Sequence, residues 1–515
     1  MNNLKVKVDI IQNKESKEYE AAQGTSIAKA LKSMGFFVDS VCGGIGKCGK
    51  CKIKVSAPIN IEITAEERRH LDEKEIKDGI RLACSIPVVD GMKIWIDQPI
   101  VNQEKSAFPL CIAASENIGA AVDIGTTTIV LSLVDISTGK VISTESTTNP
   151  QVVYGADVIS RIAYAGNNPS RLKEMQKMII SAINRLVDSA LKNTAQNKKS
   201  IYKVVVSGNT VMLHLFQGLD VQSLGIFPYE TKNTAALKKN GNETGLKVIP
   251  NGEVCILPCI SAFLGADIVS GVLKTKMYQS EKMCILLDLG TNGEIVAGNR
   301  FKMVGCSTAA GPAFEGAGIK CGSTNVEGAI DKIFSNGKNI SYTTIGNMPP
   351  KSICGSGIID ITAILFEKGV IQENGRMLNY NQDNQSFLIA EGENKIVFTQ
   401  EDVRQVQLAK SAAATGIMMI MKRLNIDFND VDKLYIAGNF GSFLNIQNAV
   451  KIGLIPESLK DKIVIVGNSS VDGAVECLLD FGLIEECSKI QMHVEYYDIG
   501  MDKDFQESYV NNLNF

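Results

Sequence analysis

Hydrophobic and polar residues alternate at the beginning of the chain, which predicts a half-buried strand. Over residues 4–10, Val6, Val8 and Ile10 alternate with charged residues, and a period of two places the apolar set on one face of a sheet. Residues 52–55 and 92–96 repeat this alternation. A short helix is predicted over 25–32, where Thr25 can cap its start. The pattern therefore predicts a small domain of strands and one helix over residues 1–98.

A different pattern, an apolar run ending in Asp-x-Gly-Thr, occurs twice in the rest of the chain. Residues 120–130 read AAVDIGTTTIV, and residues 285–296 read ILLDLGTNGEIV. Each predicts a strand, a tight turn and a second strand, and each hairpin continues to another turn, at 138–139 and at 298–299. Two such copies indicate an internal duplication.

Composition narrows the class of protein. A chain of 515 residues with 45% hydrophobic residues is long enough for about three domains, which excludes disorder, collagen and a small disulfide scaffold. The formal net charge is −3 and no long Lys/Arg run occurs, so nucleic acid is not expected as a partner. No apolar stretch approaches the ~20 residues of a membrane helix and the start lacks the apolar region of a secretion signal. We expect a cytoplasmic protein with no membrane partner.

Four of the 13 cysteines fall in the first 84 residues, at Cys42, Cys48, Cys51 and Cys84. A [2Fe–2S] cluster needs four thiolates, and a glycine-rich loop such as CGGIGKCGKC can supply three of them while wrapping the cluster closely. Zinc is the alternative, but structural zinc sites usually take their ligands in two C-x2-C-like pairs. We favour the iron–sulfur cluster and expect the other nine cysteines to be packing residues.

The repeated hairpins carry a second chemistry. A tight turn with glycine at its apex exposes backbone N–H groups, and threonine hydroxyls add donors, so each turn suits the phosphates of a nucleotide such as ATP. The aspartates, Asp123 and Asp288, can hold Mg²⁺ through water and organise catalysis. The predicted phosphate-binding residues are Gly125, Thr126, Thr127, Thr128, Gly290, Thr291, Asn292 and Gly293. Glu294 is a weaker candidate, because as a strand residue it can equally face solvent.

A third element follows both hairpins. Residues 434–442 read LYIAGNFGS, a strand and a small-residue turn preceded by a helix predicted over 401–424 after Thr399. Gly438 and Gly441 would let the backbone pass close to a flat base. We therefore expect these two glycines to border adenosine.

The three elements, in order, resemble the phosphate-1, phosphate-2 and adenosine motifs of the acetate and sugar kinase, Hsp70 and actin superfamily. The x5 spacing of the first cysteines is similar to that of adrenodoxin-style [2Fe–2S] ferredoxins. Together they resemble one family, the ATP-dependent reductive activators of corrinoid proteins. Segments 207–212, 306–316 and 353–357 also look like that family's.

The resemblance implies an α/β and α+β multidomain fold, with a β-grasp ferredoxin domain followed by a duplicated, ribonuclease H-like, actin-like ATPase unit of two lobes. The expected domains are the ferredoxin (1–98), a linker (99–117), the first lobe (118–280), the second lobe (281–490) and a tail (491–515). The implied activity is transfer of one electron from the [2Fe–2S] cluster to Co(II) corrinoid, with ATP hydrolysis, to regenerate Co(I) for methyl transfer.

The implied partners are a corrinoid protein of a methyltransferase system and a low-potential electron donor; the resemblance leaves room for a homodimer. No Asp-x-His-x-x-Gly box occurs, so the chain does not look like the corrinoid carrier itself. Three alternatives stay open: a small-molecule kinase with an attached redox domain, an activator of a radical dehydratase, and a redox-responsive scaffold without enzymatic activity.

Overall fold

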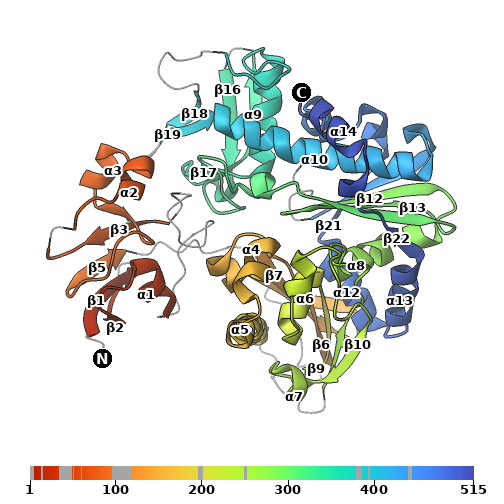
Figure 1. Ribbon diagram of the computed structural model, residues 1–515, viewed down its shortest axis with the longest axis horizontal. Coiled ribbons are helices and arrows are strands. Elements are labelled where there is room, and N and C mark those ends of the chain that lie inside the picture. The colour runs from red at the N-terminus through yellow and green to blue at the C-terminus, as the bar shows by residue number, and fades with distance from the viewer. Residues whose placement is uncertain are drawn as a thin grey trace. The chain divides into compact units, whose positions relative to one another are not determined.

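The computed structural model describes most of the chain, and Figure 1 traces its elements from the N-terminus to the C-terminus. The described residues are 5–12, 15–33, 49, 51–59, 61–95, 117–194, 201–248, 252–337, 339–378, 386–391, 395–438 and 444–515. The chain divides into two compact units: residues 1–100 with 148–166 form the first, and residues 101–147 with 167–515 form the second.

The first unit contains a mixed five-stranded sheet. Its strands are β1 (Lys5–Gln12), β2 (Glu15–Ala22), β3 (Lys52–Ser56), β4 (Ile80–Leu82) and β5 (Met92–Trp95), in the order β2-β1-β5-β3-β4. β1 pairs parallel with β5 and antiparallel with β2, and α1 (Ile27–Ser33) contributes Ile27 and Leu31 to the core. This arrangement is the predicted β-grasp ferredoxin fold.

The three strands predicted for this unit are confirmed, but the helix begins at Ile27 rather than at Thr25. β2 and β4 were not predicted. They are the two edge strands. Half of the β2 residues are charged, as is common at sheet edges, and β2 lacks the alternation that marks a half-buried strand. The unit also contains α2 (Ala65–His70), α3 (Glu73–Lys77), the short 3₁₀ helix η1 (Pro150–Tyr154) and α4 (Val158–Ala165).

The second unit is built on two six-stranded sheets. The first comprises β6 (Ile118–Ile124), β7 (Thr128–Asp135), β8 (Lys140–Thr148), β9 (Ile201–Gly208), β10 (Leu237–Asn240) and β11 (Glu253–Ile256). The second comprises β12 (Met283–Leu289), β13 (Gly293–Gly298), β14 (Met303–Thr308), β20 (Val431–Ala437), β21 (Ile463–Gly467) and β22 (Val494–Tyr496).

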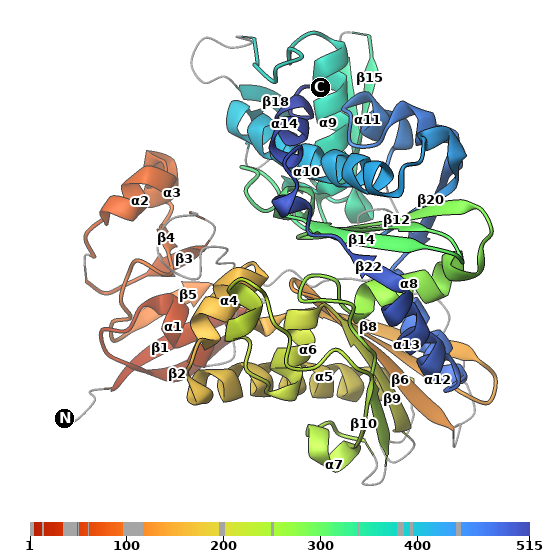
Figure 2. The same ribbon diagram turned by 45° about the vertical axis from the view of Figure 1, so that its right-hand side comes forward.

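The two sheets share one topology. Their orders are β10-β11-β9-β6-β7-β8 and β21-β20-β12-β13-β14-β22. In each, an antiparallel hairpin (β6–β7, β12–β13) is flanked by two parallel strands (β9 and β11, β20 and β21). Figure 2 shows both sheets. The shared order of five strands confirms the internal duplication, and we call the parts built on these sheets the first and second lobes.

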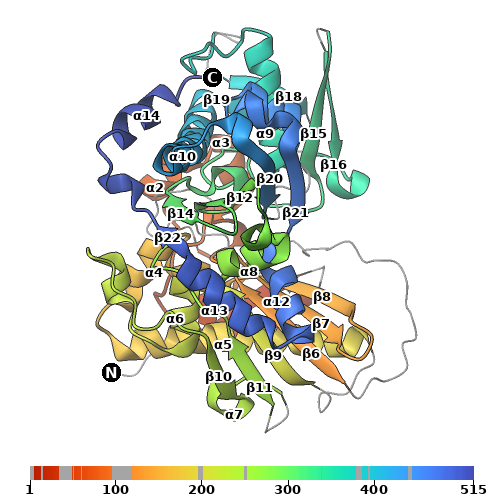
Figure 3. The same ribbon diagram turned by 90° about the vertical axis from the view of Figure 1, so that its right-hand side faces the viewer.

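Helices cover both faces of the first sheet. They are α5 (Pro169–Asn193), α6 (Thr210–Gln217), α8 (Ala266–Thr275) and α12 (Ser469–Leu479). α13 (Leu483–His493) packs on α8 and α12, and α7 (Gly241–Thr244) connects β10 to β11. α12 follows β21 of the second sheet, yet it packs on β6 and β9 of the first, beside α8 and α13 (Figure 3). The chain therefore connects the lobes through α8 and again through α12.

α8 and α12 cross with little space between them. A Cβ atom on Gly473 would lie 2.4 Å from the carbonyl oxygen of Ser270, and one on Gly271 would lie 2.9 Å from Ser469 Oγ. Real Cβ atoms do not approach other atoms so closely, so glycine is required at Gly473 for the backbones to meet. The crossing is therefore fixed by close backbone contact.

The second lobe carries the remaining elements. They are β15 (Ala329–Asn336), β16 (Asn339–Thr344), β17 (Ser352–Ile353), α9 (Gly355–Glu367), β18 (Ser386–Glu391), β19 (Lys395–Thr399), α10 (Gln400–Leu424), α11 (Ile446–Lys451) and α14 (Phe505–Asn511). The predicted helix over 401–424 is confirmed: Thr399 caps α10 in a capping box with Asp402.

The last residues join the second lobe. β22 lies within the predicted tail (491–515) and pairs parallel with β14, and α14 packs on α10. In the described part of the chain, no helix is both long enough and apolar enough to span a bilayer.

Candidate iron–sulfur and nucleotide sites

Two of the four predicted cluster cysteines come together in the first unit. Cys51 precedes β3 and Cys84 follows β4, and the pairing of Lys52 with Leu82 brings the ends of these strands side by side. The two Sγ atoms lie 3.2 Å apart. Cys51 is buried and Cys84 is half-buried, so these thiols can bind one metal centre near the surface. Cys42 and Cys48 lie outside the described residues.

The glycine at the end of the cysteine loop is required for a reason that sequence did not indicate. Gly49 has φ +64°, and a Cβ atom there would lie 2.7 Å from Cγ of His70, the last residue of α2. We expected the loop glycines to make room for the cluster. At Gly49 the His70 side chain also excludes a Cβ atom.

A buried ion pair supports the strand that leads to Cys84. Glu67 is fully buried; Arg81 donates to it from Nε and Nη2, both at 2.8 Å, and the backbone N–H of Leu82 donates at 3.0 Å. Burial raises the pKa of Glu67, but the hydrogen bonds from Arg81, Thr64 and Leu82 outweigh it and hold the pKa below its ordinary value. α2 is thereby fixed to β4.

The two predicted phosphate hairpins meet in the second unit. Thr127 Oγ1 lies 3.2 Å from Thr291 Oγ1. Both hydroxyls donate to Oε2 of Glu315, at 3.1 Å and 2.8 Å. Glu315 ends the 3₁₀ helix η5 (Pro312–Glu315). It lies within segment 306–316, which the sequence singled out without assigning a role to this residue.

Each hairpin turn is tight. The N–H of Gly125 donates to the carbonyl of Thr128 at 3.0 Å, and the N–H of Gly290 donates to the carbonyl of Asn292 at 3.0 Å. A Cβ atom on Gly125 would lie 2.7 Å from the Thr128 oxygen. The first turn therefore requires glycine at Gly125.

Two of the predicted phosphate-binding residues, Thr126 and Gly293, are held against neighbouring side chains. Thr126 is buried, and its hydroxyl accepts from Nδ2 of Asn209 at 3.0 Å. Asn209 also caps α6, so Thr126 links the hairpin to that helix. Gly293 lies under Thr308, whose Oγ1 would be 2.6 Å from a Cβ atom there.

Asp123 lies at the end of β6 and is held by α12. Ser470 Oγ donates to Oδ1 of Asp123 at 2.8 Å, and Asn468 Nδ2 donates to Oδ2 at 3.2 Å. Burial raises the pKa of Asp123, and these two hydrogen bonds oppose the rise. Ser470 and Asn468 carry no motif that sequence alone would have identified.

Three more carboxylates lie close enough to affect one another. Burial, and then the charges of Asp123 and Glu315, raise the pKa of Asp288 to about 7. Burial, and then the charges of Asp123 and Asp288, raise the pKa of Asp267 to about 8. Asp267, in the first turn of α8, was missed because a single aspartate at a helix start usually only caps it.

Glu294 belongs to the same group. It pairs with Asp288 across the β12–β13 ladder. Burial, and then the charges of Asp267 and Asp288, raise its pKa well above the ordinary value. Glu294 is half-buried beside these carboxylates. Within the described residues, no three His, Cys, Asp or Glu side chains are arranged to ligate one metal ion directly.

Gly438 lies against the second hairpin. Its φ is +92°, and a Cβ atom would lie 2.7 Å from the Leu289 oxygen and 3.1 Å from Asp288 Oδ1. A Cβ atom on Gly208, at the end of β9, would likewise lie 2.5 Å from the Ile124 oxygen. The two glycines are structural counterparts in the duplicated lobes. Gly441 lies outside the described residues.

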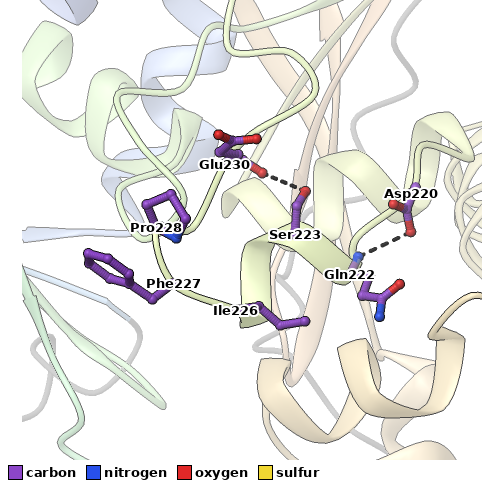
Figure 4. A pocket seen from close by; sticks show the side chains of 7 residues that line it. All are labelled: Asp220, Gln222, Ser223, Ile226, Phe227, Pro228 and Glu230. Atoms are coloured by element: carbon purple, nitrogen blue, oxygen red, sulfur yellow. Dashed lines mark hydrogen bonds between the residues drawn. The ribbon is translucent and has the colours of Figure 1, made fainter.

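A surface pocket in the first lobe is separate from these groups. It is lined by Asp220, Gln222, Ser223, Ile226, Phe227, Pro228 and Glu230 (Figure 4). Phe227 is exposed there, and Ser223 Oγ donates to the Glu230 carbonyl at 2.7 Å. None of these residues is a predicted site residue.

Three family models match the chain in succession. A 2Fe-2S iron–sulfur cluster binding domain matches residues 10–89, the middle region of RACo matches 118–280, and the C-terminal ASKHA domain of RACo matches 282–515. ASKHA is the acetate and sugar kinase, Hsp70 and actin superfamily that the hairpins resemble.

Proteins similar over most of the chain carry related names. The corrinoid activation enzyme RamQ of Eubacterium limosum is 30% identical over 97% of both chains. A [Co(II) methylated amine-specific corrinoid protein] reductase of Methanosarcina barkeri is 23% identical over 77% of both. A solved structure named reductive activator for corrinoid, iron-sulfur protein matches with a TM-score of 0.74 and 29% identity, over 99% of this chain and 98% of that one. The chain belongs to the family of corrinoid activation enzymes.

Proposed function

We propose that this protein reduces the Co(II) corrinoid of a partner protein to Co(I), one electron at a time, and that ATP hydrolysis drives the step. Family membership and the joining of the two hairpins through Thr127, Thr291 and Glu315 support the proposal. The hairpin contact carries the ATP part of it, because it brings two phosphate-binding turns within reach of one nucleotide.

Cys51 and Cys84, with Cys42 and Cys48, would hold the [2Fe–2S] cluster. The two observed thiols fit it: Sγ of Cys51 and Sγ of Cys84 lie 3.2 Å apart, close enough for both to serve one cluster. When bound, the cluster supplies single electrons. The protein's own contribution is to fix the two thiols at the ends of paired strands and to brace β4 through Glu67 and Arg81.

Mg²⁺–ATP would lie between the hairpins. The charge of Asp123 raises the pKa of Asp288 and of Asp267, and the charge of Asp288 also raises that of Asp267, so a cation near these carboxylates relieves their repulsion. Since no three of the described carboxylates are arranged as direct ligands, the ion would be held largely through water, as Mg²⁺ commonly is. Asp267 is our candidate for orienting the attacking water, and Gly438 and Gly441 for bordering adenosine.

ATP is needed because the one-electron reduction of Co(II) to Co(I) is unfavourable. For a one-electron step about 59 mV changes the equilibrium tenfold, so a deficit of about 200 mV leaves under about 1% of the cobalt reduced. ATP can shift this balance only if the protein's conformations differ in affinity for nucleotide and for partner. We propose that closure of the lobes on ATP changes the grip on the corrinoid protein, while a separate low-potential donor refills the cluster.

The test mixes the reduced full-length protein with Co(II) corrinoid proteins and follows the Co(I) absorption band. We expect Co(I) with Mg²⁺–ATP and little with a non-hydrolysable analogue. Cys84→Ser protein is the control for the electron route. Equal Co(I) without nucleotide would contradict the role of ATP, and appearance of a phosphorylated metabolite would favour a small-molecule kinase instead.

A further inference from the structure

Three serine hydroxyls form a buried chain that ends at Asp123. Ser470 Oγ donates to Asp123 Oδ1 at 2.8 Å and lies 2.9 Å from Ser207 Oγ. Ser207 Oγ lies 3.0 Å from Ser270 Oγ. The serines are 0%, 0% and 4% exposed at Ser207, Ser270 and Ser470. Buried hydroxyls with partners on both sides keep a fixed orientation, because water cannot replace either partner.

This chain of serine hydroxyls links elements of the first lobe to the two helices that connect the lobes. Asp123 and Ser207 lie on neighbouring strands of the first sheet, β6 and β9. Ser270 lies on α8, which leads from the first lobe to the second, and Ser470 lies in the first turn of α12, which returns from it. The hydroxyls therefore meet where these helices cross.

The two helices are in close contact at this crossing. Ser270 takes part through its backbone as well, since its carbonyl is the atom that a Cβ on Gly473 of α12 would meet at 2.4 Å. A shift of α12 along α8 must displace Ser470 relative to Ser207. Because Ser470 holds one oxygen of Asp123, the carboxylate turns with it.

We propose that Ser470 is the positioning residue of Asp123, and that the chain through Ser207 to Ser270 makes the orientation of this carboxylate depend on how α8 and α12 cross. This inference rests on the proposed role of Asp123 in binding Mg²⁺–ATP. Through these hydroxyls, a movement of the lobes can change the orientation of Asp123 although neither α8 nor Ser207 binds the metal ion. Asn468 also donates to Asp123, at the longer distance of 3.2 Å, but it is not part of the serine chain.

The neighbouring serine provides a matched control. Ser469 is in the same helical turn and is 1% exposed, but its Oγ has no hydrogen-bond partner among the described residues. Ser469→Ala and Ser470→Ala thus remove the same atom from equally buried positions. Only the second variant breaks the chain to Asp123.

The experiment measures the Mg²⁺ requirement of ATP turnover in the full-length protein. Because hydrogen bonds to charged groups are strong, Ser470→Ala should raise the half-saturating Mg²⁺ concentration about tenfold or more, and Ser469→Ala by less than about twofold. The Ser207 hydroxyl bonds to Ser270 and Ser470 rather than to Asp123, so Ser207→Ala should raise the half-saturating Mg²⁺ concentration about threefold by freeing Ser470. Saturating Mg²⁺ should restore most of kcat in each, and Ser470→Thr should retain the wild-type requirement.

An equal Mg²⁺ requirement in Ser470→Ala and Ser469→Ala would overturn the inference. If circular dichroism shows that Ser470→Ala does not fold, Ser207→Ala decides: an unchanged requirement overturns the chain. Calorimetry of the wild-type protein with Mg²⁺–ATP separates the two proposals, since absence of binding there removes the proposed function itself.

Discussion

The hydroxyl of Thr127 lies 3.2 Å from that of Thr291, although 164 positions separate them in sequence. Each threonine belongs to one copy of the duplicated hairpin, and both donate to the same oxygen of Glu315. One carboxylate oxygen therefore joins the two turns. The two copies of the hairpin are thus joined by hydrogen bonds to a residue that lies outside the repeat.

Replacing Glu315 should separate the role of its hydrogen bonds from that of its charge. Glu315→Ala removes the shared acceptor, so we expect faster hydrogen–deuterium exchange in both turns, 125–128 and 290–293. Glu315→Gln keeps a carbonyl oxygen that can accept from both threonines, and its exchange should stay close to wild type. Unchanged exchange in the alanine variant would show that Glu315 does not join the turns.

Loss of Cys84 should empty the cluster site. Cys84→Ser removes one of four predicted thiolate ligands, so the purified protein should lose most of its iron and acid-labile sulfide together with its visible absorption. Cys321→Ser is the control, because Cys321 is also half-buried but lies in the second unit. Equal iron content in the two variants would contradict the assignment of Cys84.

The buried pair of Glu67 and Arg81 should matter far more than an exposed pair. Arg81→Met leaves the Glu67 carboxylate buried without its partner, which should cost about 3–5 kcal/mol in the free energy of unfolding. The control is Lys52→Met, which breaks the exposed pair with Glu75 and should cost at most about 1 kcal/mol. Trp95, the only tryptophan, lies in β5 of the same unit, so its fluorescence in a urea titration reports the difference.

The same pair sets an acid limit for the first unit. The pKa of Glu67 is lower in the folded state than its ordinary value. The contribution of Glu67 to stability is therefore complete above about pH 4.3, the pKa of an unperturbed glutamate. It is lost as pH falls through the lower, folded pKa. Trp95 fluorescence should show the first unit unfolding in this range, and Glu67→Gln should flatten the pH dependence there. A wild-type transition well above this range would contradict the role of Glu67.

Asp267 should act in ATP hydrolysis rather than in ATP binding. If it orients the attacking water, Asp267→Asn should lower kcat about 100-fold, while calorimetry finds the Kd for ATP changed by less than about threefold. Asp472→Asn is the control: burial also raises the pKa of Asp472, but its charged neighbours are Lys274 and Glu476. A matching loss of kcat in both variants would point to a general effect of α8 and α12 on folding.

Local patterns explain which elements could be predicted. The strands of alternating character, both hairpins and the capped start of α10 at Thr399 follow from neighbouring residues, and all are confirmed. β2 was missed because this edge strand does not alternate, and β4 because its three residues are too few to show a period. The role of Gly438 beside Asp288 could not be seen either, since it depends on how β20 pairs with β12.

The sequence by itself determined the cysteine spacing, the duplicated hairpin and the order of the motifs, because each is written in a continuous stretch of residues. Only the tertiary structure decided that Glu315 joins the hairpins, that Asp267 and Glu294 belong with Asp288, and that Ser470 holds Asp123. Each of these side chains comes from a different element, and none stands in a local pattern that marks it. Their meeting is fixed by strand order and by the crossing of α8 and α12, which depend on contacts between residues far apart along the chain.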